Sequence, residues 1–296
     1  MSWRVTVPCT RAQGEAIEMM DELTGLDGSP PILVADEPDP AKPDEWLIHV
    51  YFEQPPTDLD LAAVAGLGNG APQIEALGES DWVTMSQAGL QPIRAGRFFV
   101  HTPTHRGSIP AGTTPFEIDA GLAFGTGQHA TTAGCLEELD MLASNGCEFT
   151  NIADVGTGTG LLAFAALSLW PHAKCIATDI DPVAIDVARE NAAINRVPLG
   201  HGAGELLLAA ADGMQSPMLA ARAPFDLIVA NILAGPLIEL ASDFADGLAP
   251  GGTIMLAGLL DTQADAVVAA YEALGLSPVR RGPGEWPVLV LRSPAQ

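Results

Sequence analysis

Residues 154–160 read Asp-Val-Gly-Thr-Gly-Thr-Gly, and this stretch decides the fold class of the chain. It follows a short apolar run, residues 151–155, that predicts a buried strand, and it precedes residues 161–169, which predict a helix. Glycines let the backbone turn sharply and approach a ligand closely. The spacing is G-x-G-x-G, and it lacks the last glycine of the dinucleotide pattern G-x-G-x-x-G. Such a turn alone is a weak indicator of a ligand, because many glycine-rich turns only pack a helix tightly.

Strands and helices alternate regularly around this turn. We expect helices over residues 130–143, 161–169, 182–195, 236–248 and 264–274, and strands over residues 151–155, 174–179, 225–231, 252–259 and 286–292. The alternation predicts an α/β fold, a doubly wound and mostly parallel Rossmann-like sheet with helices on both faces. A turn at residues 281–284 joins two terminal strands, which indicates an antiparallel hairpin at one edge of the sheet.

The first 80 residues predict a separate, small α+β unit. Strands are expected at residues 3–8, 32–35 and 46–52, and helices at residues 12–23 and 59–67. This order favours a ferredoxin-like module. We therefore expect a small N-terminal domain at residues 1–78, a linker at 79–115, and the Rossmann-like domain at 116–296.

The chain is strongly acidic, with a formal net charge of −24. Residues 1–80 hold fifteen acidic and three basic residues, a net charge of −12. An acidic surface repels nucleic acid and attracts basic partners. The alternative is that the acidity only keeps the protein soluble or follows the composition of its host. Either interpretation excludes direct binding to bare nucleic acid.

Cysteine usage and hydropathy bear on the compartment. The four cysteines are far apart and form no C-x-x-C pair, so we interpret them as small buried side chains in a reducing cytosol, with no metal site. The sequence contains no apolar run long enough to span a membrane, and residues 1–5 lack the layout of a signal peptide. We expect a soluble cytoplasmic protein with no membrane partner.

Two polar residues end predicted strands of the sheet, where ligands bind in open α/β folds. Asp179 ends the second strand and could accept hydrogen bonds from both hydroxyls of a ribose; the alternative is a capping or turn residue. Asp181 precedes Pro182 and is expected to cap the next helix. Asn231 ends the strand from residue 225, and its side-chain carbonyl could accept a hydrogen bond from an amine. The alternative is an asparagine chosen because it tolerates turns.

Residues 124–132, Phe-Gly-Thr-Gly-Gln-His-Ala-Thr-Thr, form the fourth notable segment. Two glycines and several hydroxyls before a helix predict a loop with capping capacity. Its chemistry alone does not distinguish a ligand lid from an ordinary loop at a helix start. A single histidine, His129, is more often structural than catalytic.

Together these segments resemble the PrmA family, the methyltransferases of large-subunit ribosomal protein eleven. The resemblance extends over essentially the whole chain and is carried by residues 123–132 (AFGTGQHATT), 154–160 (DVGTGTG), 179–182 (DIDP) and 230–234 (ANILA). The glycine-rich turn is shared by a very broad class of proteins. The pattern F-G-T-G-x-H-x-T-T combined with A-N-I-L is far more selective.

The resemblance implies an S-adenosylmethionine-dependent protein N-methyltransferase. Its substrate would be a basic ribosomal protein of the large subunit, modified on the N-terminal α-amine and on lysine side chains and recognised by the N-terminal domain. Many amine methyltransferases carry N-P-P-Y where this chain has Asn-Ile-Leu-Ala at 231–234, so an aromatic wall beside the acceptor must come from elsewhere, with Phe124 as the candidate. The implied cofactor ligands are Thr132, Gly156, Asp179 and Asn231, and we add Gly158, Phe124 and Gly127.

The catalytic candidates are Asn231 and His129. An amine must lose its proton before it attacks, since lysine has a reference pKa of about 10.4. Asn231 is no strong base, so we expect it to orient the amine while water takes the proton; His129 is the candidate for a protein base. We expect a monomer.

Three alternatives compete with this interpretation. The first is a methyltransferase of the same fold acting on another protein or on a small amine. The second is a nicotinamide-dependent oxidoreductase, which the missing glycine of the G-x-G-x-x-G pattern disfavours. The third is a non-catalytic binding module, disfavoured because Gly156, Asp179 and Asn231 stand at three separate strand ends.

Overall fold

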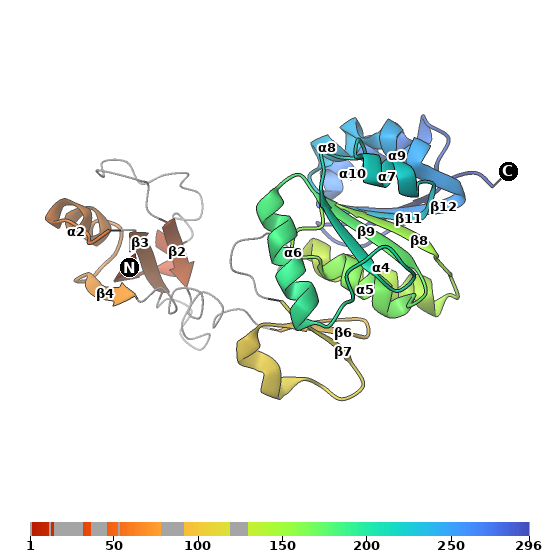
Figure 1. The fold of residues 1–296 in the computed structure, drawn as a ribbon. Helices are drawn as coiled ribbons and strands as arrows, with labels where there is room; N and C mark the ends of the chain where they lie inside the picture. Colours follow the sequence, from red (N-terminus) through yellow and green to blue (C-terminus); the bar gives the residue numbers. More distant parts are fainter. Residues whose placement is uncertain are drawn as a thin grey trace. The chain divides into compact units, whose positions relative to one another are not determined.

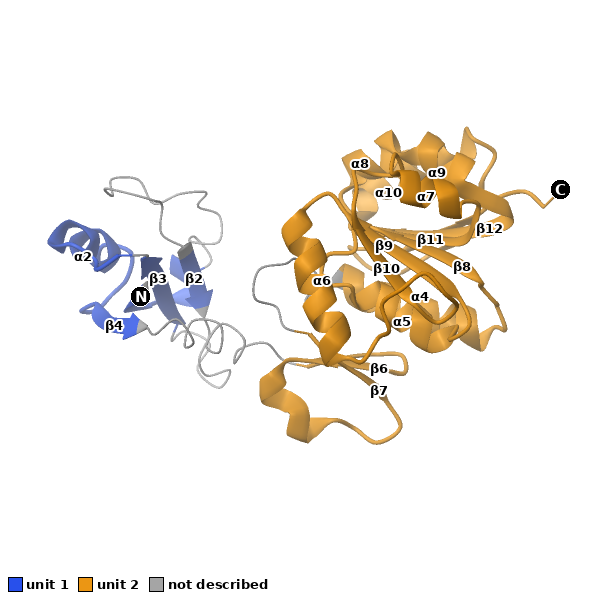
Figure 2. Cartoon of the chain, viewed as in Figure 1, with its two compact units in different colours: residues 1–89 blue, residues 90–296 orange. Residues whose placement is uncertain are grey.

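The computed structural model describes residues 2–11, 13–14, 32–36, 46–52, 54–77, 92–118 and 130–295. The chain divides into two compact units, residues 1–89 and residues 90–296 (Figure 2). The first unit contains one described sheet and the second contains two.

The first unit contains a four-stranded antiparallel sheet in the order β2-β3-β1-β4. Its core consists of alternate residues of β1 and β3 together with Val64 of the helix α2. The predicted strands at residues 3–8, 32–35 and 46–52 are confirmed, whereas β4 was not predicted and most of the predicted helix at 12–23 lies outside the described residues. The described elements are β1 (Ser2–Cys9), β2 (Ile32–Asp36), β3 (Trp46–Phe52), α2 (Asp58–Ala65) and β4 (Gln73–Leu77).

The second unit begins with a small three-stranded sheet, β5-β6-β7, which the sequence analysis had included in the linker. Phe98, Val100 and Phe116 of this sheet belong to the same buried cluster as the first helices of the large domain. Asn195 holds β7 by both backbone groups of Glu117, donating to its carbonyl at 2.7 Å and accepting from its N–H at 2.8 Å. Residues 92–118 are thus packed into the second unit. Their elements are β5 (Ile93–Ala95), β6 (Phe98–His101), η1 (Pro103–Ser108) and β7 (Thr114–Glu117).

The main sheet of the second unit has seven strands in the order β10-β9-β8-β11-β12-β14-β13. The first five are mutually parallel, and β14 and β13 complete the sheet as an antiparallel hairpin at one edge, as predicted. The strands are β8 (Asn151–Val155), β9 (Lys174–Asp179), β10 (Leu206–Ala210), β11 (Phe225–Asn231), β12 (Leu248–Ala257), β13 (Ser277–Arg281) and β14 (Leu289–Arg292).

Helices cover both faces of this sheet (Figure 1). One buried cluster joins α4 and α5 to the sheet, and a second joins α7 to α10 to its other face. This doubly wound arrangement confirms the predicted fold class. The helices are α4 (Ala130–Ser144), α5 (Leu161–Leu169), α6 (Pro182–Ile194), α7 (Pro217–Arg222), α8 (Ala234–Glu239), α9 (Ala241–Gly247) and α10 (Asp261–Glu272).

The single helix predicted over residues 236–248 is wrong. The structure has two short helices, α8 and α9, that meet at Leu240, whose backbone lies at φ −85° and ψ 0°. Those angles lie at the edge of the right-handed helical region, close to the third residue of a type I turn, so the helix is interrupted at Leu240. The strand β12 begins immediately afterwards at Leu248, four residues before the predicted start at residue 252.

Candidate active site

The strand β8 lies at the point where the strand order reverses, between β9 and β11. Ligands of open α/β sheets bind at the carboxyl ends of strands at such a point. The glycine-rich turn follows β8, Asp179 ends β9 and Asn231 ends β11. The structure therefore brings these predicted residues to the side of the sheet formed by the carboxyl ends of its parallel strands, here called the carboxyl edge.

The turn after β8 is held against the end of β9 by backbone hydrogen bonds. The N–H groups of Gly156 and Thr157 donate to the carbonyl of Thr178 at 2.8 and 2.9 Å. The next free amide, on Gly158, donates to Asp179 Oδ2 at 2.9 Å. The backbone of this turn is thus fixed before any ligand arrives.

Gly156 is required for two reasons. Its φ is +76°, a conformation that L side chains rarely adopt. In addition, a Cβ at this position would lie 2.2 Å from Cγ2 of Ile232, at the end of β11. The absence of a side chain therefore brings the turn after β8 against the segment that carries Asn231.

Asp179 is a half-buried carboxylate that serves two backbone segments. Its Oδ2 accepts from Gly158, and its Oδ1 accepts from the N–H of Asp181 at 3.0 Å. Asp181 in turn accepts from the N–H of Val183 at 2.9 Å and caps α6, as predicted. Both interpretations of Asp179 therefore have support, since it braces turns and still presents a partly exposed carboxylate at the sheet edge.

Asn231 is paired with a residue from the start of α4. Its amide nitrogen donates to Oγ1 of Thr132 at 3.3 Å, and Thr132 is buried. Two predicted site residues that lie far apart in the sequence are therefore in contact. The other predicted residues, Phe124, Gly127 and His129, lie outside the described residues.

Sequence analysis did not single out the buried carboxyl of Asp154, the second-last residue of β8. Thr157 Oγ1 donates to its Oδ2 at 2.6 Å. Burial raises the pKa of Asp154 to about 7, with a smaller contribution from the charge of Asp179 and with the hydrogen bond from Thr157 acting in the opposite direction. An acidic residue inside an otherwise apolar strand, two positions before a glycine turn, was the available signal.

A second residue that was missed is Asn191, which is fully buried on α6. Its amide nitrogen donates to the carbonyl of Thr159 at 3.1 Å. This bond ties the glycine-rich turn to the same helix that holds β7 through Asn195.

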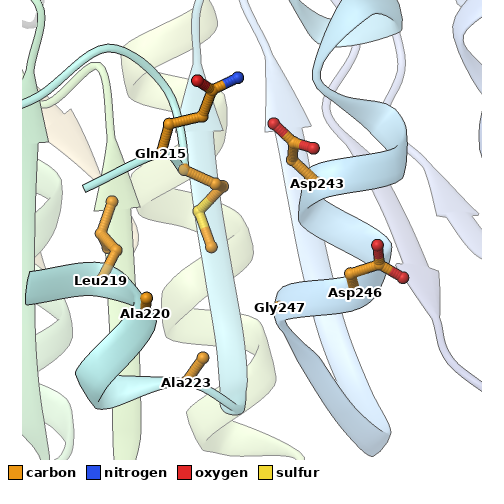
Figure 3. Close-up of a pocket in the computed structure, with 8 residues that line it drawn as sticks. Gln215, Leu219, Ala220, Ala223, Asp243, Asp246 and Gly247 are labelled. Carbon is orange, nitrogen blue, oxygen red and sulfur yellow. The ribbon is translucent and has the colours of Figure 1, made fainter. Parts of the chain in front are cut away.

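The cleft in Figure 3 is a different feature of the molecule. It has a volume of about 240 Å³ and lies between α7 and α9, near the amino ends of β11 and β12. No described site residue lines it. The strand ends, not this cleft, carry the predicted binding residues, and fold topology places ligands at the former.

Among the residues that the structure describes, no group of three or more His, Cys, Asp and Glu side chains is arranged to hold a metal ion. Within the same part of the chain, no helix combines the length and the apolar character that crossing a membrane requires.

Comparisons with known proteins were made for the whole chain. The family described as "Ribosomal protein L11 methyltransferase (PrmA)" matches residues 9–293. The ribosomal protein L11 methyltransferase of Brucella suis is 49% identical over 230 residues, which cover 78% of each chain. That of Caulobacter sp. is 39% identical over 289 residues, 96% of this chain and 95% of its own.

A solved structure gives a matching result for the fold. The crystal structure of the ribosomal protein L11 methylase from Lactobacillus delbrueckii subsp. bulgaricus aligns with a TM-score of 0.55 and 29% identity. The alignment covers 69% of this chain and 100% of the other.

Proposed function

The chain belongs to the ribosomal protein L11 methyltransferase family, and on that premise we propose that it methylates the N-terminal α-amine and lysine side chains of ribosomal protein L11. It is an S-adenosylmethionine-dependent protein methyltransferase. Membership argues against both the oxidoreductase and the non-catalytic module. The remaining alternative is a methyltransferase of the same fold that acts on another protein or on a small amine.

The residues at the carboxyl edge fit S-adenosylmethionine, which when bound supplies a methyl group on a sulfonium. Gly156 lets the glycine-rich turn pack against the segment that carries Asn231, and Gly158 donates its N–H to the carboxylate of Asp179. A partly exposed carboxylate is a suitable acceptor for the two hydroxyls of a ribose. We assign cofactor binding to Gly156, Gly158 and Asp179, together with Asn231 at the end of β11 and Thr132 near the start of α4.

Asn231 carries the proposed catalytic role, and its hydrogen bond is the observation that supports it. The bond to Thr132 uses the amide nitrogen, so the side-chain carbonyl oxygen is left to accept a bond from an incoming amine. Displacement at a methyl group needs the nitrogen, the methyl carbon and the sulfur in line, and orientation can lower the barrier by several kcal/mol. Asn231 would thus orient the acceptor without acting as a base.

The amine must lose its proton before it attacks. We propose that water takes this proton, with His129 as the candidate for a protein base. The variant His129→Ala tests the second possibility, because removing a general base changes the pH profile of turnover. An unchanged profile removes His129 from the mechanism.

We assign recognition of the ribosomal protein to the N-terminal domain, predicted at residues 1–78. The excess of twelve negative charges in the first 80 residues suits a basic protein partner. We assign methyl transfer to the predicted domain at 116–296 together with residues 92–115 of the predicted linker, which pack into the same unit. We further propose that the enzyme works as a monomer in the cytoplasm, where ribosomal proteins are made.

The test of the proposal is mass spectrometry of ribosomal protein L11 after incubation with the enzyme and S-adenosylmethionine. We expect mass increases of whole methyl groups, mapped to the N-terminal amine and to lysines. An unmodified L11 together with methylation of a small amine would favour the alternative. A variant without residues 1–78 should lose activity on L11 if that domain recognises the substrate.

A further inference from the structure

Ile232, which follows Asn231, lies between two glycines that come from different strand ends. On one side its Cγ2 atom packs over Gly156, after β8. On the other side its backbone packs against Gly258, directly after β12. The peptide that follows Asn231 is therefore confined from both sides.

The contact with Gly258 involves backbone on both partners. A Cβ at position 258 would lie 2.4 Å from the carbonyl oxygen of Ile232, 2.8 Å from its carbonyl carbon and 2.9 Å from its nitrogen. No rotation of a side chain can relieve such an overlap. Any side chain at 258 must displace the Ile232 peptide, which is covalently joined to Asn231.

The register of the sheet makes this displacement local to the site. Asn231 pairs with Ala257 in the parallel ladder between β11 and β12, so Gly258 is the first residue beyond the last pair. The strands upstream are buried and well paired. A side chain at 258 would therefore move the end of β11 rather than its core.

We propose that Gly258 is a positioning residue for methyl transfer, because only a glycine there lets the Ile232 peptide hold the Asn231 side chain in place. This rests on the proposed role of Asn231 as the group that orients the acceptor amine. Gly258 touches neither the glycine-rich turn nor Asp179 in the contacts described above. Its substitution should lower the rate of transfer and leave cofactor affinity nearly unchanged.

A matched control separates this effect from backbone strain. Gly258 has φ +85° and Gly275 has φ +88°, so alanine is equally strained at both positions. A Cβ at Gly275 meets nothing within 4 Å, whereas a Cβ at Gly258 meets the Ile232 backbone. The two variants Gly258→Ala and Gly275→Ala thus differ in the contact under test.

The assay is steady-state methylation of ribosomal protein L11 by the full chain, with calorimetric titration of S-adenosylhomocysteine. We expect Gly258→Ala to lower kcat about tenfold or more relative to Gly275→Ala, since misplacement by about 1 Å can cost a hundredfold in rate. The Kd for S-adenosylhomocysteine should change by less than about threefold, because the other proposed cofactor ligands, Gly158 and Asp179, keep their contacts. Equal kcat values for the two variants would overturn the proposal.

A second variant covers the case in which Gly258→Ala does not fold. Ile232→Ala removes the side chain that packs on Gly156 and leaves Gly258 unchanged, so the Asn231 segment is confined from one side only. We expect a lower kcat from this variant and a double variant no slower than the slower single one, because both changes act on one element. Wild-type turnover by Ile232→Ala contradicts the inference.

A readout independent of activity separates this inference from the proposed function. The side-chain amide of Asn231 gives an NMR signal that can be assigned by its loss in Asn231→Ala. Gly258→Ala should shift that signal and Gly275→Ala should not, whatever the acceptor is. If wild-type enzyme fails to methylate L11 but the shift is selective, the substrate assignment fails and the positioning role stands. No selective shift removes the positioning role.

Discussion

The carboxyl edge of the seven-stranded sheet lies opposite the amino edge, which is formed by the amino ends of the parallel strands. An aspartate at each edge accepts a different number of hydrogen bonds from the protein. At the amino edge, the carboxylate of Asp226 accepts three hydrogen bonds from Thr150 and Asn151, at 2.7, 2.8 and 3.0 Å. At the carboxyl edge, Asp179 accepts one backbone N–H on each oxygen, from Gly158 and Asp181. A carboxylate has about four acceptor positions, so Asp179 keeps the greater capacity for a ligand.

The two edges also differ in which segments of the chain meet there. At the carboxyl edge, Gly156 and Gly258 bring two turns against the segment that carries Asn231. At the amino edge, the cleft between α7 and α9 is lined by Asp243 and Asp246 but brings together none of the predicted site residues that the structure describes. The protein itself thus uses most of the acceptor capacity of Asp226, whereas Asp179, the proposed binding group, is held in place and left partly available.

The largest expected effect concerns Asn231. Asn231→Ala should lower kcat about a hundredfold, the usual order for losing an orienting contact, and should change cofactor affinity far less. Steady-state kinetics with ribosomal protein L11 and calorimetry with S-adenosylhomocysteine measure the two effects separately. A variant that weakens only binding would show that Asn231 is a cofactor ligand and no orienter.

The buried Asp154 sharpens the comparison through pH. Because burial raises its folded-state pKa to about 7, above the unfolded value of 3.8, the stability associated with this group is complete below pH 4 and is lost as pH rises to about 7. The variant Asp154→Asn has no carboxyl group to ionise at this position, so this loss of stability with rising pH should be absent. Between pH 5.5 and 8.5 the variant should therefore gain about 2 kcal/mol on the wild type, from 1.36 kcal/mol per pKa unit.

Urea denaturation at the two pH values measures this difference. The control is Asp226→Asn, the same substitution in the partly exposed hydrogen-bond network with Thr150 and Asn151. Parallel pH dependence of wild type and Asp154→Asn would contradict a raised pKa at Asp154.

The smallest effect is expected at the amino edge. Asp226→Ala removes the acceptor of three hydrogen bonds donated by Thr150 and Asn151. These donors are partly exposed, so water can accept from them in place of the carboxylate. The free energy of unfolding should therefore fall by about 1.5 kcal/mol. The measurement is the midpoint of thermal or urea unfolding. Turnover per folded molecule should equal that of the wild type. A large fall in kcat would contradict the purely structural role that we assign to Asp226.

Much of this fold could be predicted, because local signals were strong where the chain is buried. The strands β8, β9 and β11 match the predicted ranges, since each is a short apolar run that ends in a polar residue or a glycine. The strand β10 and the helix α7 were not predicted. The run of leucine and alanine in β10 favours a helix as much as a strand, so the pattern does not decide between them. The helix α7 has only six residues, too few to show a helical period.

The positions of the candidate site residues at strand ends could be predicted from the sequence, but the contacts between those residues could not. Sequence placed Asp179 and Asn231 at strand ends, where topology brings ligands. It could not pair Asn231 with Thr132, because that contact depends on how α4 packs on the sheet. Nor could it find Gly258, whose importance arises only from the register between β11 and β12.

The central claim is that the carboxyl edge binds the cofactor and the amino edge does not. The most direct measurement is calorimetric titration of S-adenosylmethionine into the full chain carrying Asp179→Asn or Asp226→Asn, the same substitution at opposite edges. We expect Asp179→Asn to weaken cofactor binding about 10- to 100-fold, because charge-assisted hydrogen bonds are lost. The variant Asp226→Asn should bind the cofactor as tightly as the wild type does. Undiminished affinity in Asp179→Asn, or equal losses in both variants, would contradict the central claim.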